Sequence, residues 1–177
     1  MNIDPTLPAS YEYIHYTGEN ITTLDLNRAY TQIVKKWTIY SPNGLWLSIP
    51  GINDWEHYCL KNNCNLGTLK NEFQVFLKTT AKILILFNSA LFEDFIKKYG
   101  YYSEHNTIDL LIRWEKIIIN YQGIALPCRL PKLSNMGLWN KIWFCTSACI
   151  WDLQAVEKVE KLGIMKGNSC IVPECFK

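Results

Sequence analysis

Two short segments combine residue types that suit a planar, polar ligand. The first is His15-Tyr16-Thr17, and the second, about thirty positions later, is Gly44-Leu45-Trp46-Leu47-Ser48. In an extended strand alternate side chains share a face, so Trp46 and Ser48 lie opposite the neighbouring aliphatic side chains. That face offers an aromatic surface and a hydroxyl, and His15 adds an imidazole that hydrogen-bonds in either protonation state. Packing in a core or at a sheet edge is the alternative interpretation of both segments.

Together the two segments resemble the ADP-ribosyltransferase superfamily, in particular its poly(ADP-ribose) polymerase and diphtheria-toxin branch. The resemblance implies an α+β fold with a twisted, mostly antiparallel split sheet and flanking helices, and it implies NAD as the substrate. In this family the His holds a ribose of NAD, the next residue's backbone holds the nicotinamide carboxamide, and the strand aromatic stacks on the nicotinamide. The implied NAD-binding residues are His15, Tyr16, Thr17, Gly44, Leu45, Trp46 and Ser48.

The third element of the family pattern differs in this chain. The family's late strand carries a Glu that binds the ribose and stabilises an oxocarbenium-like transition state, whereas Trp143–Trp151 contains no carboxylate. Ser147 or Thr146 is expected to hold a ribose hydroxyl there, and Asp152 is the nearest acid in sequence. The catalytic residues that the resemblance implies are therefore His15, Trp46 and Ser147.

Three functions follow as hypotheses. The first is an NAD-dependent ADP-ribosyltransferase that modifies a protein or nucleic-acid acceptor, as a toxin or effector does, in the cytoplasm of its own cell or of a target cell. The second is an inactive NAD- or partner-binding module of the same fold, which the missing Glu favours. The third is a hydrolase or transferase that uses Cys149 or Cys59 with a His partner, although no local signature supports it.

The cysteine pattern favours reduced thiols over a disulfide framework. Seven cysteines are present, an odd number, and Met1–Pro5 does not begin an export signal, so we expect a cytoplasmic protein. The Cys145/Cys149 and Cys170/Cys175 spacings are wider than the usual zinc knuckles, so no metal site is predicted.

Composition predicts one folded domain over residues 1–177. Hydrophobic residues make up 49% and charged residues 19%, which argues against disorder. The net charge of +2 comes without a polybasic block, so charge alone indicates no nucleic-acid surface. The longest apolar run, Ile83–Phe87, is too short to cross a bilayer, so no membrane partner is expected.

Hydrophobic periodicity predicts strands and helices in mixed order, which favours an α+β fold. One of the helices, which begins after Asn53 or Asp54, carries Trp55 and Tyr58 beside the proposed pocket, where core packing is the alternative role for both. Strands are expected at 11–16, 45–49, 72–77, 82–87, 124–126, 142–149 and 170–172, and helices at 25–36, 54–61, 89–99, 108–120 and 152–161.

Overall fold

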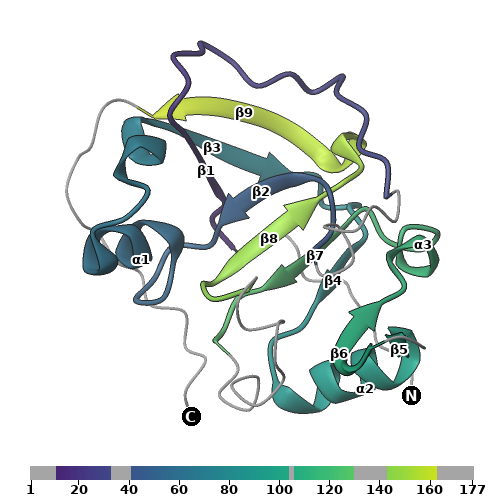
Figure 1. Ribbon diagram of the computed structural model, residues 1–177. Coiled ribbons are helices and arrows are strands. Elements are labelled where there is room, and N and C mark those ends of the chain that lie inside the picture. The colour runs from purple at the N-terminus through teal and green to yellow at the C-terminus, as the bar shows by residue number, and fades with distance from the viewer. Residues whose placement is uncertain (1–10, 33–40, 104–105, 130–142, 163–177) are drawn as a thin grey trace.

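The computed structural model describes residues 11–32, 41–103, 106–129 and 143–162. Pairs of consecutive strands are separated by helices along the chain, and the elements gather around a central sheet (Figure 1). In chain order the elements are β1 (Ile14–Thr17), β2 (Leu45–Ser48), α1 (Trp55–Asn62), the 3-10 helix η2 (Leu66–Lys70), β3 (Asn71–Leu77), β4 (Ile83–Ile85), α2 (Ser89–Tyr99), β5 (Gly100–Ser103), β6 (Asn106–Ile112), α3 (Trp114–Ile117), β7 (Gly123–Leu126), β8 (Ser147–Ile150), the 3-10 helix η4 (Leu153–Ala155) and β9 (Val156–Leu162).

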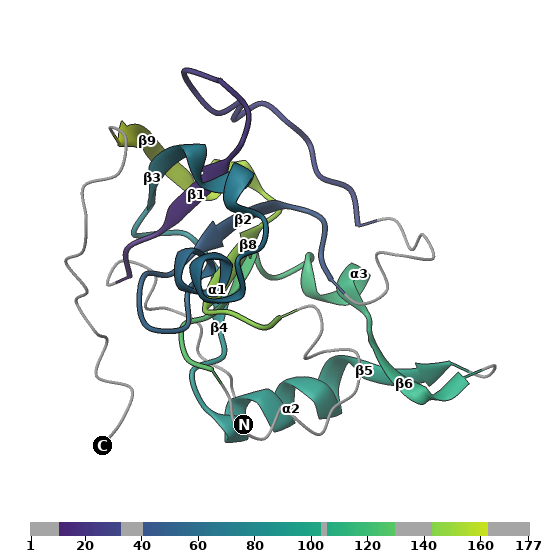
Figure 2. The same cartoon turned by 60° about the vertical axis from the view of Figure 1, so that its left-hand side comes forward.

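The main sheet has seven strands in the order β4-β7-β8-β2-β1-β3-β9. Every neighbouring pair is antiparallel except β4 and β7, which run parallel. Strands β5 and β6 form a separate hairpin that projects from the end of α2, away from the main sheet (Figure 2). The predicted α+β class with a mostly antiparallel sheet is therefore confirmed.

The main sheet consists of two halves joined at a narrow point. Strand β2 pairs with β8 at four successive positions, and β1 pairs with β3 at four. In contrast, β1 and β2 pair at one position, Ile14 opposite Ser48. The strands β4, β7, β8 and β2 therefore form one half, and β1, β3 and β9 form the other.

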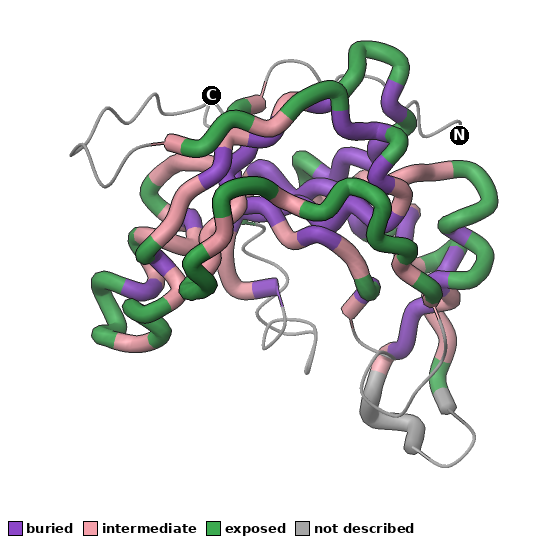
Figure 3. Tube along the Cα trace, turned by 90° about the horizontal axis from the view of Figure 1, so that it is seen from above, coloured by how far each residue is buried: buried purple, intermediate pink, exposed green. Residues whose placement is uncertain are grey.

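Apolar side chains cover both faces of the sheet centre. On one face Leu84 and Ile124 pack against Phe95 of α2 and Trp114 of α3. On the other face a second cluster includes Leu47 and is closed at its rim by residues of η4 and β9. Figure 3 shows the buried residues gathered in the central strands and the exposed residues around them. Among the described residues, no helix has the length and apolarity that a membrane span requires.

Two helices were predicted with accurate bounds. Helix α1 begins where the Asp54 side chain accepts a hydrogen bond from the His57 amide, the N-terminal cap expected there. Helix α2 spans Ser89–Tyr99, as its apolar stripe predicts, with Asn88 as the cap.

The helix expected over 25–36 is wrong across 25–32, and residues 33–36 lie outside the described residues. Asp25 accepts a hydrogen bond from the amide of Asn27, two residues on, and such a local turn competes with helix formation. Tyr30 packs against both apolar clusters from this irregular segment. Burial of Tyr30 therefore does not require a helix.

The helices expected over 108–120 and 152–161 are also corrected. Residues Asn106–Ile112 form β6, and only Trp114–Ile117 is helical. Residues Val156–Leu162 form the edge strand β9, in which Lys158 and Glu160 form an ion pair of 2.7 Å. Side chains two apart share a face in a strand and not in a helix, and pairing with β3 decides between the two periodicities.

The late strand is shorter than expected. Strand β8 covers Ser147–Ile150, whereas the prediction ran from 142 to 149 and began outside the described residues. The strand predicted at 170–172 lies wholly outside them.

Close contact between β2 and β8 leads to a prediction for Gly44. A Cβ at this position would lie 2.6 Å from the Cys149 sulfur and 2.7 Å from the Ile150 carbonyl oxygen. Gly44→Ala is therefore expected to lower the free energy of unfolding by about 1–3 kcal/mol, as overpacking does. Urea denaturation measures the change, with Gly67→Ala as the control because no heavy atom would lie within 4 Å of its Cβ. Equal stabilities of the two variants would contradict this packing.

Candidate functional site

The point where β1 and β2 separate is closed by a side chain. The Nδ1 atom of His15 lies 2.9 Å from the backbone oxygen of Trp46. Extending the register from Ile14 and Ser48 would place Tyr16 opposite Trp46, but the strand pairing ends before that position. The imidazole therefore satisfies the carbonyl that the Tyr16 amide would bind in a continuous sheet.

The peptide of Tyr16 consequently faces the gap. Hydrogen bonding alternates along an antiparallel strand, and the Val75 amide donates to the Tyr13 carbonyl at 2.8 Å on the β3 side. Even-numbered positions of β1 therefore direct their backbone groups toward β2. At Ile14 the partner is Ser48, and at Tyr16 the sheet is open.

The bond to Trp46 also fixes the tautomer of His15. A carbonyl oxygen only accepts hydrogen bonds, so Nδ1 carries the proton and Nε2 of the neutral ring keeps its lone pair. Burial lowers the pKa of His15 below its ordinary value of 6.5, although the bond to Trp46 and the charge of Glu19 oppose this effect. At neutral pH the ring therefore offers Nε2 as an acceptor for a hydroxyl group.

Two tryptophans supply the aromatic surfaces. Trp46 projects from β2 and meets Trp143 edge to face, with ring centroids 5.0 Å apart. Trp55, the first residue of α1, donates from its indole nitrogen to the Thr68 hydroxyl at 3.1 Å. Its backbone amide donates to the Ser48 hydroxyl, and its ring stacks on Tyr58. Both indoles are therefore held in place without a ligand.

The late strand contributes one hydroxyl to this region. Ser147 lies opposite Ser48 in the pairing of β8 with β2, and it donates its proton to the Cys145 carbonyl at 3.1 Å. Its oxygen therefore remains an acceptor. Thr146 is buried and donates to the Ile49 carbonyl, so of the two hydroxyls expected near a ribose only Ser147 lines the pocket.

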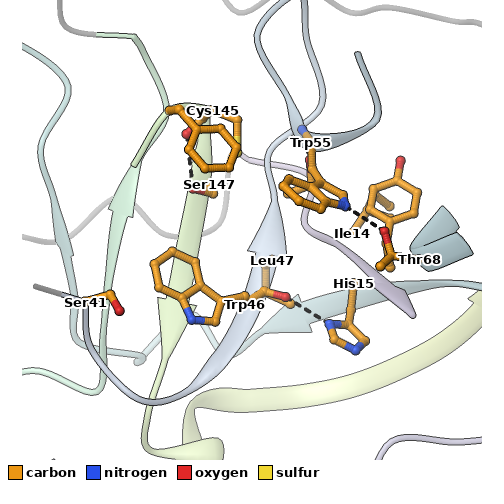
Figure 4. A pocket seen from close by; sticks show the side chains of 12 residues that line it. Ile14, His15, Ser41, Trp46, Leu47, Trp55, Thr68, Cys145 and Ser147 are labelled. Carbon is orange, nitrogen blue, oxygen red and sulfur yellow. Dashed lines mark hydrogen bonds between the residues drawn. The ribbon is translucent and has the colours of Figure 1, made fainter. Parts of the chain in front are cut away.

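These groups enclose a pocket of about 390 Å³, within the range of small-ligand sites. Figure 4 shows His15 bonded to the Trp46 backbone, with Trp55 and Ser147 contributed by other elements. None of the described residues that line the pocket is an Asp, Glu, Lys or Arg. The pocket is therefore aromatic, with a few hydrogen-bonding groups, and is formed by Ile14, His15, Tyr16, Ser41, Trp46, Leu47, Ser48, Trp55, Thr68, Phe144, Cys145 and Ser147.

Two carboxylates lie just outside the lining, around the Tyr16 phenol. The Tyr16 hydroxyl donates to Glu56 at 3.4 Å, and Tyr16 pairs with Glu72 across β1 and β3. Burial raises the pKa of the Tyr16 phenol, and the charges of Glu56, Glu72 and Asp54 raise it further. Tyr16 is therefore a neutral hydrogen-bonding group of the pocket wall.

Three of the described thiols have raised pKa values. Cys149 is fully buried, and burial raises its pKa well above the ordinary value. Burial likewise raises the pKa of Cys59 to about 11 and that of Cys145, which lines the pocket, to about 11. Thiolates are the reactive form, so these values disfavour the Cys-dependent enzyme. No group of three metal-ligating side chains gathers within the described ranges.

The expectation of reduced thiols holds for most of the described cysteines. Four are free, namely Cys59, Cys64, Cys145 and Cys149. Cys128 is disulfide-bonded, so the expectation is wrong there.

Five of the eight site residues expected from the sequence line the pocket: His15, Tyr16, Trp46, Ser48 and Ser147. The other three have different roles. Thr17 accepts a hydrogen bond from the Glu19 amide, Gly44 permits the approach of β8, and Leu45 packs in the opposite core.

Thr68, Phe144 and Ser41 line the pocket but were not predicted from the sequence as site residues. For Trp55, core packing was the alternative to a place beside the pocket. Phe144 contacts both Trp55 and Tyr58, so an aromatic cluster brings the late strand region against α1. The only sequence signal for this contact is the aromatic spacing of α1, which does not specify a distant partner.

No family model, curated protein or solved structure matches this chain. Its function must therefore be argued from the pocket itself.

The geometry at His15 predicts a depressed pKa. In an NMR titration, the His15 ring should protonate below pH 6.5, the ordinary value. Because the unfolded chain then takes up the proton first, the free energy of unfolding should decrease as the pH falls from about 6.5 to the folded-state pKa.

His15→Asn is the control for this pH dependence. Its amide nitrogen can replace Nδ1 as a donor to Trp46, and it does not titrate. The variant should therefore lose less stability than the wild type between pH 7 and pH 5. A His15 pKa at or above 6.5 would contradict the proposed environment.

Proposed function

We propose that the pocket binds the nicotinamide–ribose half of NAD in the manner of an ADP-ribosyltransferase. The observation that carries the proposal is the His15–Trp46 hydrogen bond, which leaves the Tyr16 peptide facing the pocket. A carboxamide carries one acceptor and two donor hydrogens, so a peptide N–H and C=O can bind it as a strand would. A primary carboxamide on a flat ring therefore matches the exposed N–H and C=O groups of the Tyr16 peptide.

The remaining groups match the rest of this ligand half. The Trp46 indole offers a stacking surface for the pyridinium ring, and a cationic ring gains further attraction from an aromatic face. Nε2 of His15 and the Ser147 oxygen each carry a lone pair that can accept a ribose hydroxyl. The described lining residues carry no charge that would bind the diphosphate, so the diphosphate would lie outside this part of the pocket.

The reaction of this class breaks the bond between ribose C1′ and the nicotinamide nitrogen. The electron pair leaves with nicotinamide, which becomes neutral, and the ribose develops oxocarbenium character as in glycoside hydrolysis. A nucleophile of a protein or nucleic-acid acceptor then adds to C1′ and releases its proton. Stacking on Trp46 orients the leaving group, and the Ser147 oxygen is the lone-pair donor placed toward the ribose.

A binding module without turnover is the second candidate. The specific observation in its favour is that no carboxylate is found among the described residues of the pocket lining. Fixed negative charge beside the ribose would stabilise the developing cation most strongly, so its absence lowers the expected rate. Binding and turnover therefore require separate measurements.

Isothermal titration calorimetry tests binding. NAD should bind the wild type, and Trp46→Ala should weaken binding by about 1–3 kcal/mol through lost stacking. His15→Ala should weaken it about tenfold because it removes a hydrogen bond and releases the Trp46 carbonyl. His57→Ala, on the exposed side of α1, is the matched control and should leave the affinity unchanged. Absence of NAD binding by the wild type would overturn the proposal.

Nicotinamide release tests turnover. With NAD and water as the acceptor, the wild type should release nicotinamide, and Ser147→Ala should release it about five- to tenfold more slowly because one ribose contact is lost. Chromatography of the free base measures the rate, with His57→Ala again as the control. NAD binding without any release would assign the chain to the second candidate.

A further inference from the structure

The C-terminus of α1 brings two cysteines together. Asn63 adopts a left-handed conformation with φ 48° and ψ 45°. The Cys64 amide donates to the Cys59 carbonyl at 3.1 Å, and the Asn63 amide donates to the Leu60 carbonyl at 3.3 Å. This pair of bonds defines a Schellman motif, in which the side chains at the positions of Cys59 and Cys64 contact each other.

The side chains of this pair differ in accessibility. Cys59 is 0% exposed, whereas Cys64 is partly exposed, and both thiols are free. The pKa of Cys59 is raised to about 11, mostly by burial and in smaller part by the neighbouring Cys64 thiol. An oxidant from solution therefore meets Cys64 first, with Cys59 in contact behind it.

We propose that Cys59 and Cys64 form a reversible intrachain disulfide with a low-molecular-weight disulfide, such as glutathione disulfide, as the oxidant. In the first step the Cys64 thiolate attacks the oxidant, forms a mixed disulfide and displaces one thiolate. In the second step the Cys59 sulfur, after losing its proton to solvent, attacks Cys64 and displaces the second thiolate. Two protein thiols are oxidised and two small thiols are produced. This inference does not depend on NAD binding.

The disulfide would act on the pocket wall through Thr68. Thr68 lies close enough to the Cys59 thiol to lower its pKa. The Thr68 hydroxyl accepts from the Trp55 indole at 3.1 Å and donates to the Asn65 carbonyl at 2.7 Å. Joining Cys64 to Cys59 fixes the segment that leads into η2 against α1. The position of the Trp55 indole then depends on the redox state of the pair.

Non-reducing trypsin digestion tests the pairing directly. Trypsin cleaves after Lys61, between the two cysteines, so the disulfide would join the peptide that ends at Lys61 to Asn62–Lys70. After incubation of the folded protein with glutathione disulfide, mass spectrometry should detect this linked pair, and dithiothreitol should separate it. Cys145→Ser should form the same link, whereas Cys64→Ser should not.

Two outcomes would overturn the inference. One is a link from Cys59 to Cys145, a pocket-lining thiol whose pKa is raised in part by the charge of Cys59. The other is the absence of any Cys59–Cys64 link in folded protein under conditions in which urea-unfolded protein forms it. That result would show that the native geometry keeps the sulfurs apart.

Amide hydrogen exchange tests the effect on the pocket wall. Exchange over Leu66–Lys70 should become several-fold slower on oxidation of the wild type and should not change in Cys64→Ser treated in the same way. Equal exchange before and after formation of the link would contradict the coupling to Thr68. Neither measurement uses NAD. Failure of the disulfide inference can therefore be distinguished from failure of the proposed function.

Discussion

The hydrogen bond from His15 to the Trp46 carbonyl is the constraint on which the pocket depends. It is made by a side chain at the place where a continuous sheet would use the Tyr16 amide. One imidazole therefore keeps a strand carbonyl satisfied, holds β1 and β2 at a fixed separation and leaves a peptide edge facing the pocket. Without this bond, a partly buried carbonyl would lose its partner or the two strands would pair further.

The opening is tolerated because the rest of the sheet is held from both sides. Strand β2 is paired along its length with β8, and β1 is paired along its length with β3. The apolar clusters on the two faces anchor the half that contains β4, β7, β8 and β2. A ligand can therefore bind at the narrow contact between the halves while the apolar clusters stay packed. Binding sites are often found at such junctions between structural units.

The sequence predicts the local parts of this arrangement and not the long-range ones. The strand face of Trp46 and Ser48, the Asp54 cap and the stripe of α2 follow from alternation, capping and helical spacing. The pattern of Val156–Leu162 is compatible with either a helix or a strand, and only pairing with β3 decides. Likewise, the placement of Thr68 and Phe144 at the pocket depends on contacts with Trp55, which no local pattern encodes.

The most direct test of this account is a crystal structure of the protein soaked with nicotinamide. The carboxamide should hydrogen-bond to the Tyr16 peptide, the ring should stack on Trp46, and Nδ1 of His15 should remain bonded to the Trp46 carbonyl. Nicotinamide bound elsewhere, or a pocket in which the Tyr16 amide takes the Trp46 carbonyl in place of His15, would contradict it.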